Sequence, residues 1–509
     1  MLPLARFQLP MLLLLAAAGT VILLSATENG IGVSPDSVGY ISAARSLHDG
    51  DGLNAIGPEG KTIPLVHYPP LLPALLSLSP VLGLDPVDGV RWLNAVLFGI
   101  IILLVGVISG RCVRSCPWLA PAGSFLTLAS VVMYRVYCMA LSEPLFIFLV
   151  TLGLFLLARY TQRPFLGLLI GASVAVSLSF LTRYAGIAYV LAGILWLVMQ
   201  ARRNRLGRVR DAAVFAAICV APAAIWMGRN VALAGSAVNR KPVFHPITVG
   251  FVSSAATALS RWTLPWVVIL FILLTSATWR KATRANLAAL GKNVESGPLK
   301  LFGLSILVYT AVLIASMSFV DRATTPDERI LLPAYVSSLI VTVSLAGAAI
   351  CTRQTMRFPR VLAVVLLAFL AGSFCVRTGR WIGEFRRDGR GYSARAWRGS
   401  STIAAIRQLP PDALIFTNGA DAVYILTGRI CLQIPRKVEP VSGRANAWYE
   451  AQLQQMADRL RNENGVLVIF DRITRSYLPS REELIRRLPI VLLSRTGDGW
   501  IYGTGVGNR

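Results

Sequence analysis

Residues 91–110 read RWLNAVLFGIIILLVGVISG, a run in which one cation at the start is followed by almost unbroken apolar side chains. About 20 such residues are needed for an α-helix to cross the hydrocarbon core of a bilayer. The whole chain of 509 residues has a matching composition, because 55% of its residues are hydrophobic and only 15% are charged. This balance differs from that of a soluble domain and predicts a polytopic membrane protein.

Similar apolar runs recur along the chain and predict eleven transmembrane helices within a domain over residues 1–376. The predicted spans are 9–26, 91–110, 117–134, 143–158, 164–181, 186–200, 211–227, 264–279, 301–319, 330–350 and 361–376. The first run follows Arg6 and could be a cleaved signal peptide. Its length and the lack of a clear A-x-A cleavage site favour a retained anchor.

The charge of the chain is explained by membrane topology. The formal net charge is +25, from 50 Lys and Arg against 25 Asp and Glu, which on its own could suggest nucleic-acid binding. With the N-terminus in the cytoplasm, 18 of the cations before residue 377 fall in inner segments and 11 in the longer outer ones. This is the positive-inside bias of membrane proteins, and it assigns the charge to topology and membrane lipids. We therefore expect no nucleic-acid partner.

Beyond the last apolar run, from about Gly391, the composition changes. Short β-rich runs alternate with helical patterns, which predicts a small α/β domain over residues 391–509. The predicted strands are ALIF (413–416), GVLVIF (465–470) and PIVLLS (489–494), and the predicted helices lie within 420–428 and 446–465. An odd number of spans places this C-terminal domain on the outer, extracytoplasmic side of the cell membrane.

The outer loop 27–90 contains the segment PDSVGYISAARSLH, which reads as a short helix. On a helix that begins near Ser34, Asp36 and Tyr40 lie on one face. Ser34 as an N-cap and Asp36 in the first turn are also what an ordinary helix start would contain. The spacing alone therefore leaves a catalytic and a purely structural interpretation of Asp36 open.

Further polar clusters lie at the predicted outer ends of spans. Glu143 lies in SEPLF, Arg183 in LTRYAG, and Glu328 and Arg329 in DERILLP. Ionisable groups at the edge of a membrane are costly and are therefore functional candidates. Each also has an ordinary alternative as a helix start, a capping box or a cation that reaches the lipid headgroups. All of these residues are predicted to lie at the same outer face of the membrane as Asp36, which favours a common site.

Six motifs follow one another over residues 1–350: PDSVGYISAARSLHDG, YPPLLPAL, RWLNAVLFG, SEPLFIFL, LTRYAG and ERILLPAY. In order and spacing these motifs resemble the C-type (GT-C) membrane glycosyltransferases, more so the bacterial branch related to protein mannosyltransferases and aminoarabinose transferases. The resemblance implies a GT-C fold and an inverting transfer of a sugar from a polyprenyl-phosphate carrier. The acceptor would be a lipid, a polysaccharide or a protein of the cell envelope, reached on the outer face.

The resemblance also implies roles for single residues. Asp36 is expected to be the general base for the acceptor hydroxyl or amine. A lipid phosphate is a good leaving group, so cations that neutralise its charge can replace a general acid. The residues expected to bind substrate are Tyr40, His67, Tyr68, Glu143, Arg183, Glu328 and Arg329.

No cofactor is firmly implied, and a metal site is not supported. Many relatives carry a second acid directly after the first, whereas Ser37 follows Asp36 here, which argues against a metal-binding pair. Cys112 and Cys116 lack a matching ligand pair for zinc. A transporter or lipid flippase remains the alternative function, although it would more often show matching halves with charges near the middle of the membrane. A non-catalytic assembly subunit is a third class.

Overall fold

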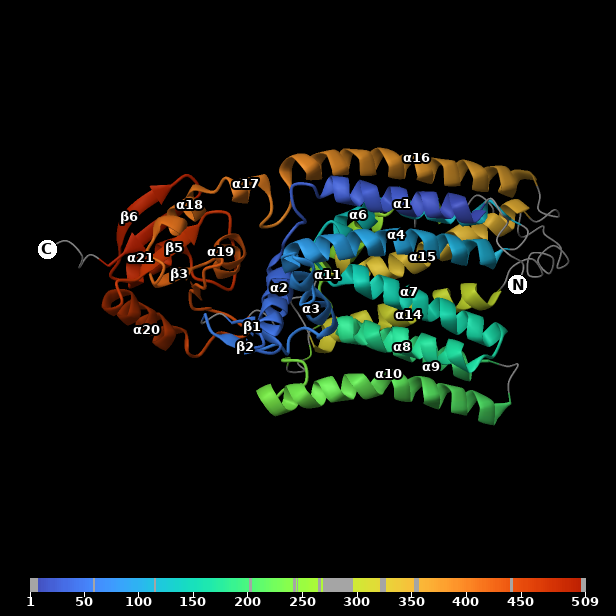
Figure 1. Ribbon diagram of the computed structural model, residues 1–509, viewed down its shortest axis with the longest axis horizontal. Coiled ribbons are helices and arrows are strands. Elements are labelled where there is room, and N and C mark those ends of the chain that lie inside the picture. Colours follow the sequence, from blue (N-terminus) through green and yellow to red (C-terminus); the bar gives the residue numbers. More distant parts are fainter. Residues whose placement is uncertain are drawn as a thin grey trace.

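The computed structural model describes residues 8–504 except 58–59, 114–115, 201–203, 241–243, 245, 264–266, 269–295, 321–325, 352–356 and 440–442. Within this part, seven helices are long and apolar enough to cross a membrane. They are α1 (Gln8–Ala26), α4 (Pro86–Cys112), α7 (Glu143–Gln162), α10 (Arg205–Ala234), α14 (Ser296–Phe319), α15 (Glu328–Cys351) and α16 (Arg357–Asp388). These helices run side by side in one bundle (Figure 1). The expected polytopic helical membrane protein is thereby confirmed.

The number of clear spans is smaller than the eleven expected. An eighth span results only if α5 (Leu119–Leu128) and α6 (Val131–Tyr137), which meet at 54°, are counted as one broken crossing. Residues 164–181 and 186–200 form shorter apolar helices, α8 (Leu166–Thr182) and α9 (Ile187–Val198). The predicted span 264–279 lies largely outside the described residues. Apolar content thus located the helices, but it did not determine where each helix ends.

Helix ends depend on local backbone geometry that hydrophobicity does not report. Ser130 has an extended backbone, with φ −77° and ψ 113°, and it breaks the predicted span 117–134 into α5 and α6. Arg183 is also extended and ends α8 ahead of the 3₁₀ helix η2 (Tyr184–Gly186). In contrast, α16 continues beyond the predicted end at residue 376 to Asp388 and leads directly into the C-terminal region.

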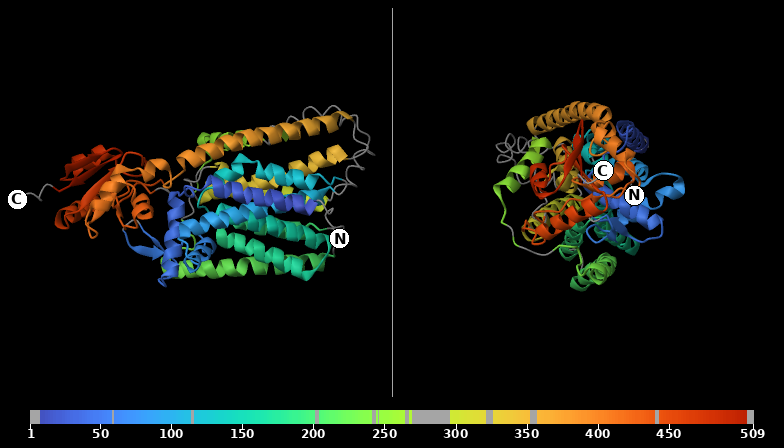
Figure 2. Two further views of the ribbon diagram at one scale, coloured as in Figure 1. Left: turned by 45° about the horizontal axis from the view of Figure 1, so that its top comes forward. Right: turned by 90° about the vertical axis from the view of Figure 1, so that its left-hand side faces the viewer.

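Short elements cover one end of the bundle, opposite the end at which α1 begins (Figures 1 and 2). They are α2 (Pro35–His48), the hairpin β1 (Asn54–Ile56) and β2 (Thr62–Pro64), α3 (Leu71–Leu76) and η1 (Ser79–Leu82). The start of α2 is fixed by a capping box, because the Ser34 side chain accepts from the Ser37 backbone N–H and the Ser37 hydroxyl accepts from the Ser34 N–H. This confirms the helix expected between the first two spans.

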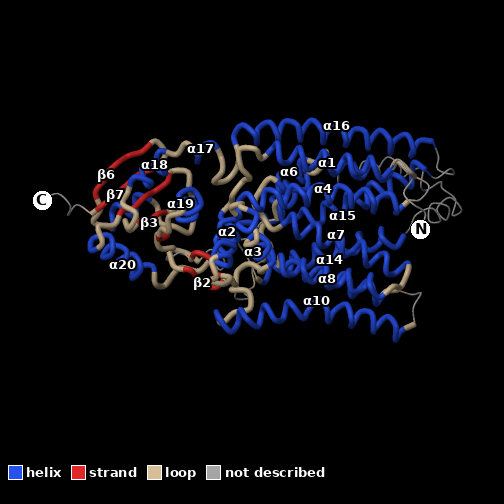
Figure 3. Tube along the Cα trace, in the orientation of Figure 1, coloured by secondary structure: helices blue, strands red, loops and turns tan. Residues whose placement is uncertain are grey.

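The C-terminal region contains a sheet with helices on both faces, and it lies beyond the end of the bundle that α2 covers (Figure 3). The strand order is β4-β3-β5-β7-β6, with β3 parallel to β4 and β5, and β7 antiparallel to β5 and β6. The strands are β3 (Ile415–Thr417), β4 (Leu432–Gln433), β5 (Val466–Phe470), β6 (Val491–Thr496) and β7 (Gly499–Gly503). The helices are α17 (Arg395–Arg398), α18 (Ser401–Gln408), α19 (Ala420–Thr427), α20 (Tyr449–Asn462) and α21 (Arg481–Arg487).

Alternation along β5 explains the layers of this region, because successive side chains of a strand point to opposite faces. Leu467 belongs to the core formed with α20, whereas Val468 belongs to the core formed with α18 and α19. The latter core is continuous with that of the helix bundle. The expected α/β architecture is confirmed, and the sheet also includes β4 and β7, which the sequence patterns did not reveal.

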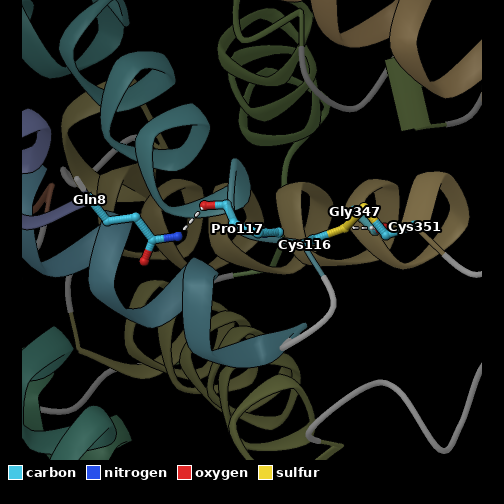
Figure 4. The surroundings of a disulfide bond; sticks show 5 residues. All are labelled: Gln8, Cys116, Pro117, Gly347 and Cys351. Carbon is cyan, nitrogen blue, oxygen red and sulfur yellow. Dashed lines mark hydrogen bonds between the residues drawn. A yellow bond between two sulfur atoms is a disulfide. The ribbon is translucent and has the colours of Figure 1, made fainter. Parts of the chain in front are cut away.

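A disulfide bond joins Cys116, just ahead of α5, to Cys351 at the end of α15, with 5.8 Å between the two Cα atoms (Figure 4). The adjacent Pro117 carbonyl accepts a hydrogen bond of 2.6 Å from the Gln8 side-chain amide at the start of α1. These contacts hold three helices together at the end of the bundle that lies away from α2.

Candidate active site

Asp36, in the first turn of α2, is held by two partners that come from distant parts of the chain. The Tyr68 hydroxyl donates to Asp36 Oδ1 at 2.8 Å. Arg329, in the first turn of α15, places its Nη2 atom 2.7 Å from Asp36 Oδ2. The Asp36 side chain is 35% exposed, so one carboxylate is both oriented by the protein and accessible from outside.

A second carboxylate, Glu143 at the start of α7, shares the same cation. Arg329 Nε donates to Glu143 Oε1, and Arg183 Nη1 lies 2.6 Å from the same oxygen. The Glu143 side chain is only 1% exposed. A buried charge of this kind requires a partner. Within the described part of the chain, its other oxygen, Oε2, is buried without a hydrogen bond. Asp36, Glu143, Arg183 and Arg329 together therefore form a charge-balanced cluster.

Tyr40 borders this cluster from the same helix as Asp36. Its hydroxyl lies 3.1 Å from Ser142 Oγ, which also accepts a hydrogen bond of 3.0 Å from Arg183 Nη1. The Tyr40 ring packs on the Tyr68 ring with 4.6 Å between centroids. Gly39 allows this arrangement, because a Cβ atom there would lie 2.9 Å from Tyr68 Cε2.

The segment that carries His67 and Tyr68 is positioned by residues that the sequence did not single out. The Arg229 side chain donates to the Leu65 carbonyl at 2.9 Å, and the Tyr184 hydroxyl donates to the Val66 carbonyl at 3.0 Å. The His67 ring then meets the Tyr68 ring edge to face at 4.7 Å. Arg229 lies just beyond the predicted span 211–227, and this position was the one signal in the sequence that could have indicated a functional role for it.

Glu328 is not brought into this cluster, although it precedes Arg329 directly. Consecutive helical residues point about 100° apart, so the two side chains face different neighbours. Arg135 Nη1 donates to both Glu328 carboxylate oxygens at 2.7 and 2.6 Å, and Arg261 lies 3.8 Å away. Beside them is a hollow of about 240 Å³, which Asp327 and hydroxyl side chains of α11 (Val249–Arg261) also line.

The electrostatics of the cluster keep Asp36 ionised and the two tyrosines neutral. Burial on its own would raise the pKa of Asp36, but the charge of Arg329 and the hydrogen bonds from Arg329 and Tyr68 outweigh it and lower the pKa below 3.8. Burial raises the pKa of Tyr40 to about 12, and burial together with Asp36 raises the pKa of Tyr68 well above 10. Asp36 can therefore accept a proton near neutral pH, whereas the tyrosines act as neutral hydrogen-bond donors.

The chain is similar to known proteins in part of its sequence and in its fold. Residues 67–226 match the family described as dolichyl-phosphate-mannose-protein mannosyltransferase. No curated protein sequence matches the chain. Among solved structures, ArnT from Cupriavidus metallidurans in the apo state matches with a TM-score of 0.61 and 14% identity over 96% of this chain and 97% of that chain.

Two further structures show the same likeness. ArnT bound to undecaprenyl phosphate matches with a TM-score of 0.59 and 12% identity, over 97% of this chain and 98% of that chain. The oligosaccharyltransferase of Archaeoglobus fulgidus matches with a TM-score of 0.54 and 13% identity, over 92% of this chain and 70% of that chain. These matches confirm the resemblance that the sequence motifs indicated.

Proposed function

Since the chain has the fold of the GT-C membrane glycosyltransferases, we propose that it is an inverting glycosyltransferase that takes a sugar from a polyprenyl-phosphate carrier. The acceptor would be a lipid, polysaccharide or protein of the cell envelope. One observation carries the proposal: Asp36 is accessible and ionised beside Arg329. Arg329 also pairs with Glu143, which in turn pairs with Arg183. A base and two cations thus meet at one end of a membrane bundle, where a lipid-linked donor and an acceptor can both arrive.

In the proposed reaction, Asp36 accepts the proton of the acceptor hydroxyl or amine. The freed electron pair attacks the anomeric carbon from the side opposite the phosphate, and the bond from that carbon to the phosphate oxygen breaks. The electron pair of this bond stays on the departing polyprenyl phosphate, whose negative charge increases by one. Arg183 and Arg329 would stabilise that added charge, so no general acid is required.

The ion pairs of the cluster must rearrange when a donor binds. Both guanidiniums are paired with carboxylates, so a donor phosphate has to compete with Asp36 and Glu143 for them. We expect Arg329 to turn from Asp36 toward the phosphate. Loss of that cation would raise the pKa of Asp36 and make it a stronger base at the moment when substrate is present.

The remaining residues of the site would shape the space around the sugar. Tyr68 orients Asp36 through its hydrogen bond, and Tyr40 packs behind it. His67, at the edge of Tyr68, would contact the sugar or the acceptor. Glu143 would hold Arg183 and Arg329 in place. Glu328 lies outside this site, because it pairs with Arg135 beside the hollow next to α11.

We further propose that the site faces the outside of the cell membrane and that the N-terminus is cytoplasmic. The excess of Lys and Arg in the predicted inner segments supports this orientation. The site and the C-terminal sheet lie at the same end of the bundle (Figure 1), so both would be extracytoplasmic. If the broken α5–α6 pair, α8, α9 and the predicted span 264–279 also cross the membrane, the seven clear spans become the eleven expected ones, an odd number as this topology requires.

The test is transfer of radiolabelled sugar from native polyprenyl-phosphate-sugars to membrane fractions. We expect Asp36→Asn to lower transfer by about 10²- to 10⁴-fold, the usual contribution of a general base. Asp88→Asn, which changes an exposed acid in the first turn of α4, serves as the matched control and should keep wild-type activity. Equal transfer by wild type and Asp36→Asn would show that the base is misassigned. No transfer by wild type from any carrier would favour a transporter or an assembly subunit.

A further inference from the structure

The residues just before α2 lie between two other segments of the chain. On one side, the Gly32 N–H donates to the Cys138 carbonyl at 2.9 Å, and the Ala140 N–H donates to the Gly32 carbonyl at 2.7 Å. On the other side, Val33 forms a parallel β-bridge with Gly391, in which the Tyr392 N–H donates to the Val33 carbonyl at 2.8 Å. The chain is therefore held on one side at Gly32 and on the other at Val33, four and three residues before Asp36.

Gly391 makes the second of these contacts feasible. Its φ of +59° lies in the left-handed region, which favours glycine. A Cβ atom at this position would lie 2.0 Å from the Val33 carbonyl oxygen, so no side chain fits without a shift of the backbone. The approach of these two segments thus depends on a glycine.

Tyr392, the next residue, is anchored in the C-terminal domain. Its hydroxyl donates to Asp421 Oδ2 at 2.7 Å, and Arg475 Nη2 lies 2.5 Å from the same oxygen. Its ring meets the Trp397 ring edge to face at 5.4 Å. Asp421 lies in the first turn of α19, which packs against α2.

A second contact joins the domain to the other end of the same helix. The Arg45 guanidinium of α2 lies 5.4 Å from the centre of the Tyr424 ring of α19. Arg45 also pairs with Asp85 at 2.8 Å. The C-terminal domain therefore touches α2 near both of its ends, whereas Arg329 and Arg183 belong to the helix bundle.

We propose that the C-terminal domain is a working part of the active site, because it fixes α2, and with it Asp36, against the cations of the bundle through Gly391 and Tyr392. These two residues act as positioning residues. Displacement of a reacting group by about 1 Å can lower a rate by roughly 100-fold, so a modest shift of α2 has a large effect. This inference rests on the proposed function and assigns the domain a role in catalysis in addition to any role in acceptor binding.

The test compares Gly391→Ala with Gly428→Ala in the full chain. Gly428 ends α19 with a φ of +74°, but nothing lies within 4 Å of a Cβ atom there, so this control carries similar backbone strain without a collision. We expect Gly391→Ala to lower kcat by about tenfold or more. KM for the donor should stay within about twofold, because Arg183 and Arg329 are not displaced.

The pH dependence separates positioning from a general loss of folded enzyme. Asp36 is faced by the charged or titratable side chains of Arg329, Arg183, Glu143, Tyr40 and Tyr68. A shift of α2 away from Arg329 and Tyr68 should move the acidic limb of the kcat/KM profile, which reports the free enzyme, upward by about half a pH unit or more. A smaller amount of folded enzyme would lower kcat at every pH without moving that limb.

Two further measurements keep the inference testable. If Gly391→Ala does not fold, Tyr392→Phe should still move the limb, because it removes the hydrogen bonds that the Tyr392 hydroxyl makes with Asp421 and Arg475. Hydrogen exchange of residues 35–48 requires no activity, and it should be faster in Gly391→Ala or Tyr392→Phe than in Gly428→Ala.

The outcomes distinguish this inference from the proposed function. If Asp36→Asn is inactive while the variants of Gly391 and Tyr392 keep wild-type kcat, pH profile and exchange, the positioning role is wrong and the transferase stands. If wild type transfers no sugar, faster exchange of α2 still supports the structural coupling, and unchanged exchange refutes it.

Discussion

Replacing Arg329 by Gln should lower both the stability of the protein and the rate of sugar transfer, because its guanidinium serves two carboxylates at once. It contacts Asp36 at 2.7 Å through Nη2 and Glu143 through Nε. Breaking a buried ion pair costs about 3–5 kcal/mol when the remaining charge is left without a partner.

The expected cost here is smaller, because neither acid is left isolated. Glu143 keeps Arg183 at 2.6 Å, and Asp36, with a side chain 35% exposed, keeps Tyr68 and some hydration. We therefore expect the free energy of unfolding to fall by about 2 kcal/mol. The rate should suffer more, because losing one preorganised donor at a developing charge lowers kcat by about 10²- to 10³-fold.

The assay combines transfer kinetics with thermal unfolding in detergent. Arg261→Gln is the matched control, because Arg261 lies 3.8 Å from Glu328 with a side chain 57% exposed, and an exposed pair contributes about 0–1 kcal/mol. Arg329→Lys should recover only part of the rate, since an ammonium group lacks the planar fork that reaches two acids. Transfer by Arg329→Gln within threefold of wild type would refute the proposed role of Arg329 in stabilising the phosphate.

Three further changes test neighbouring parts of the structure. Tyr68→Phe removes the hydrogen bond that lowers the pKa of Asp36, so the acidic limb of kcat/KM should move up by about one pH unit, measured as a pH–rate profile. Because folding lowers the pKa of Asp36 from its unfolded value of 3.8, its contribution to stability is present above that pH and is lost as the pH falls through the lower folded pKa. Unfolding midpoints of wild type, measured from about pH 5 down to about pH 2, should show this loss. Gly39→Ala should displace the Tyr68 ring, which a new Cβ atom would meet at 2.9 Å, and lower kcat about tenfold; wild-type kinetics would show that the ring adjusts without cost. Cys116→Ser removes the disulfide to Cys351 and should lower the free energy of unfolding by about 2–4 kcal/mol under non-reducing conditions while kcat stays unchanged, because that bond lies at the far end of the bundle; a fall in kcat would show coupling along the bundle.

Much of the architecture was predictable because it depends on local properties of the chain. An apolar run such as 91–110 must be helical in a membrane, since its backbone groups find no other hydrogen-bond partners there. The alternation of β-rich and helical segments after residue 391 likewise predicted the α/β architecture of the C-terminal region, whose strand β5 lies within the predicted run 465–470. The capped start of α2 was visible in the order Ser34, Pro35, Asp36.

The candidate site was predictable only as a collection of residues. Their types and their order pointed to Asp36, Arg183 and Arg329, because charged groups at the ends of membrane helices are costly to place. Arg229 and Tyr184, which hold the segment before His67, escaped notice because their function lies in contacts with backbone carbonyls. Such contacts leave no pattern in the sequence.

The sequence by itself thus determined the class of the protein, the position of its helices and the residue types available for chemistry. Only the tertiary structure decided which charges meet. It turned Arg329 toward Asp36 and its neighbour Glu328 toward Arg135, and it brought Gly391 against Val33. The reason is physical: hydrophobicity and helix capping act between residues close in the chain, whereas ion pairs and close backbone contacts depend on distances between segments that folding brings together.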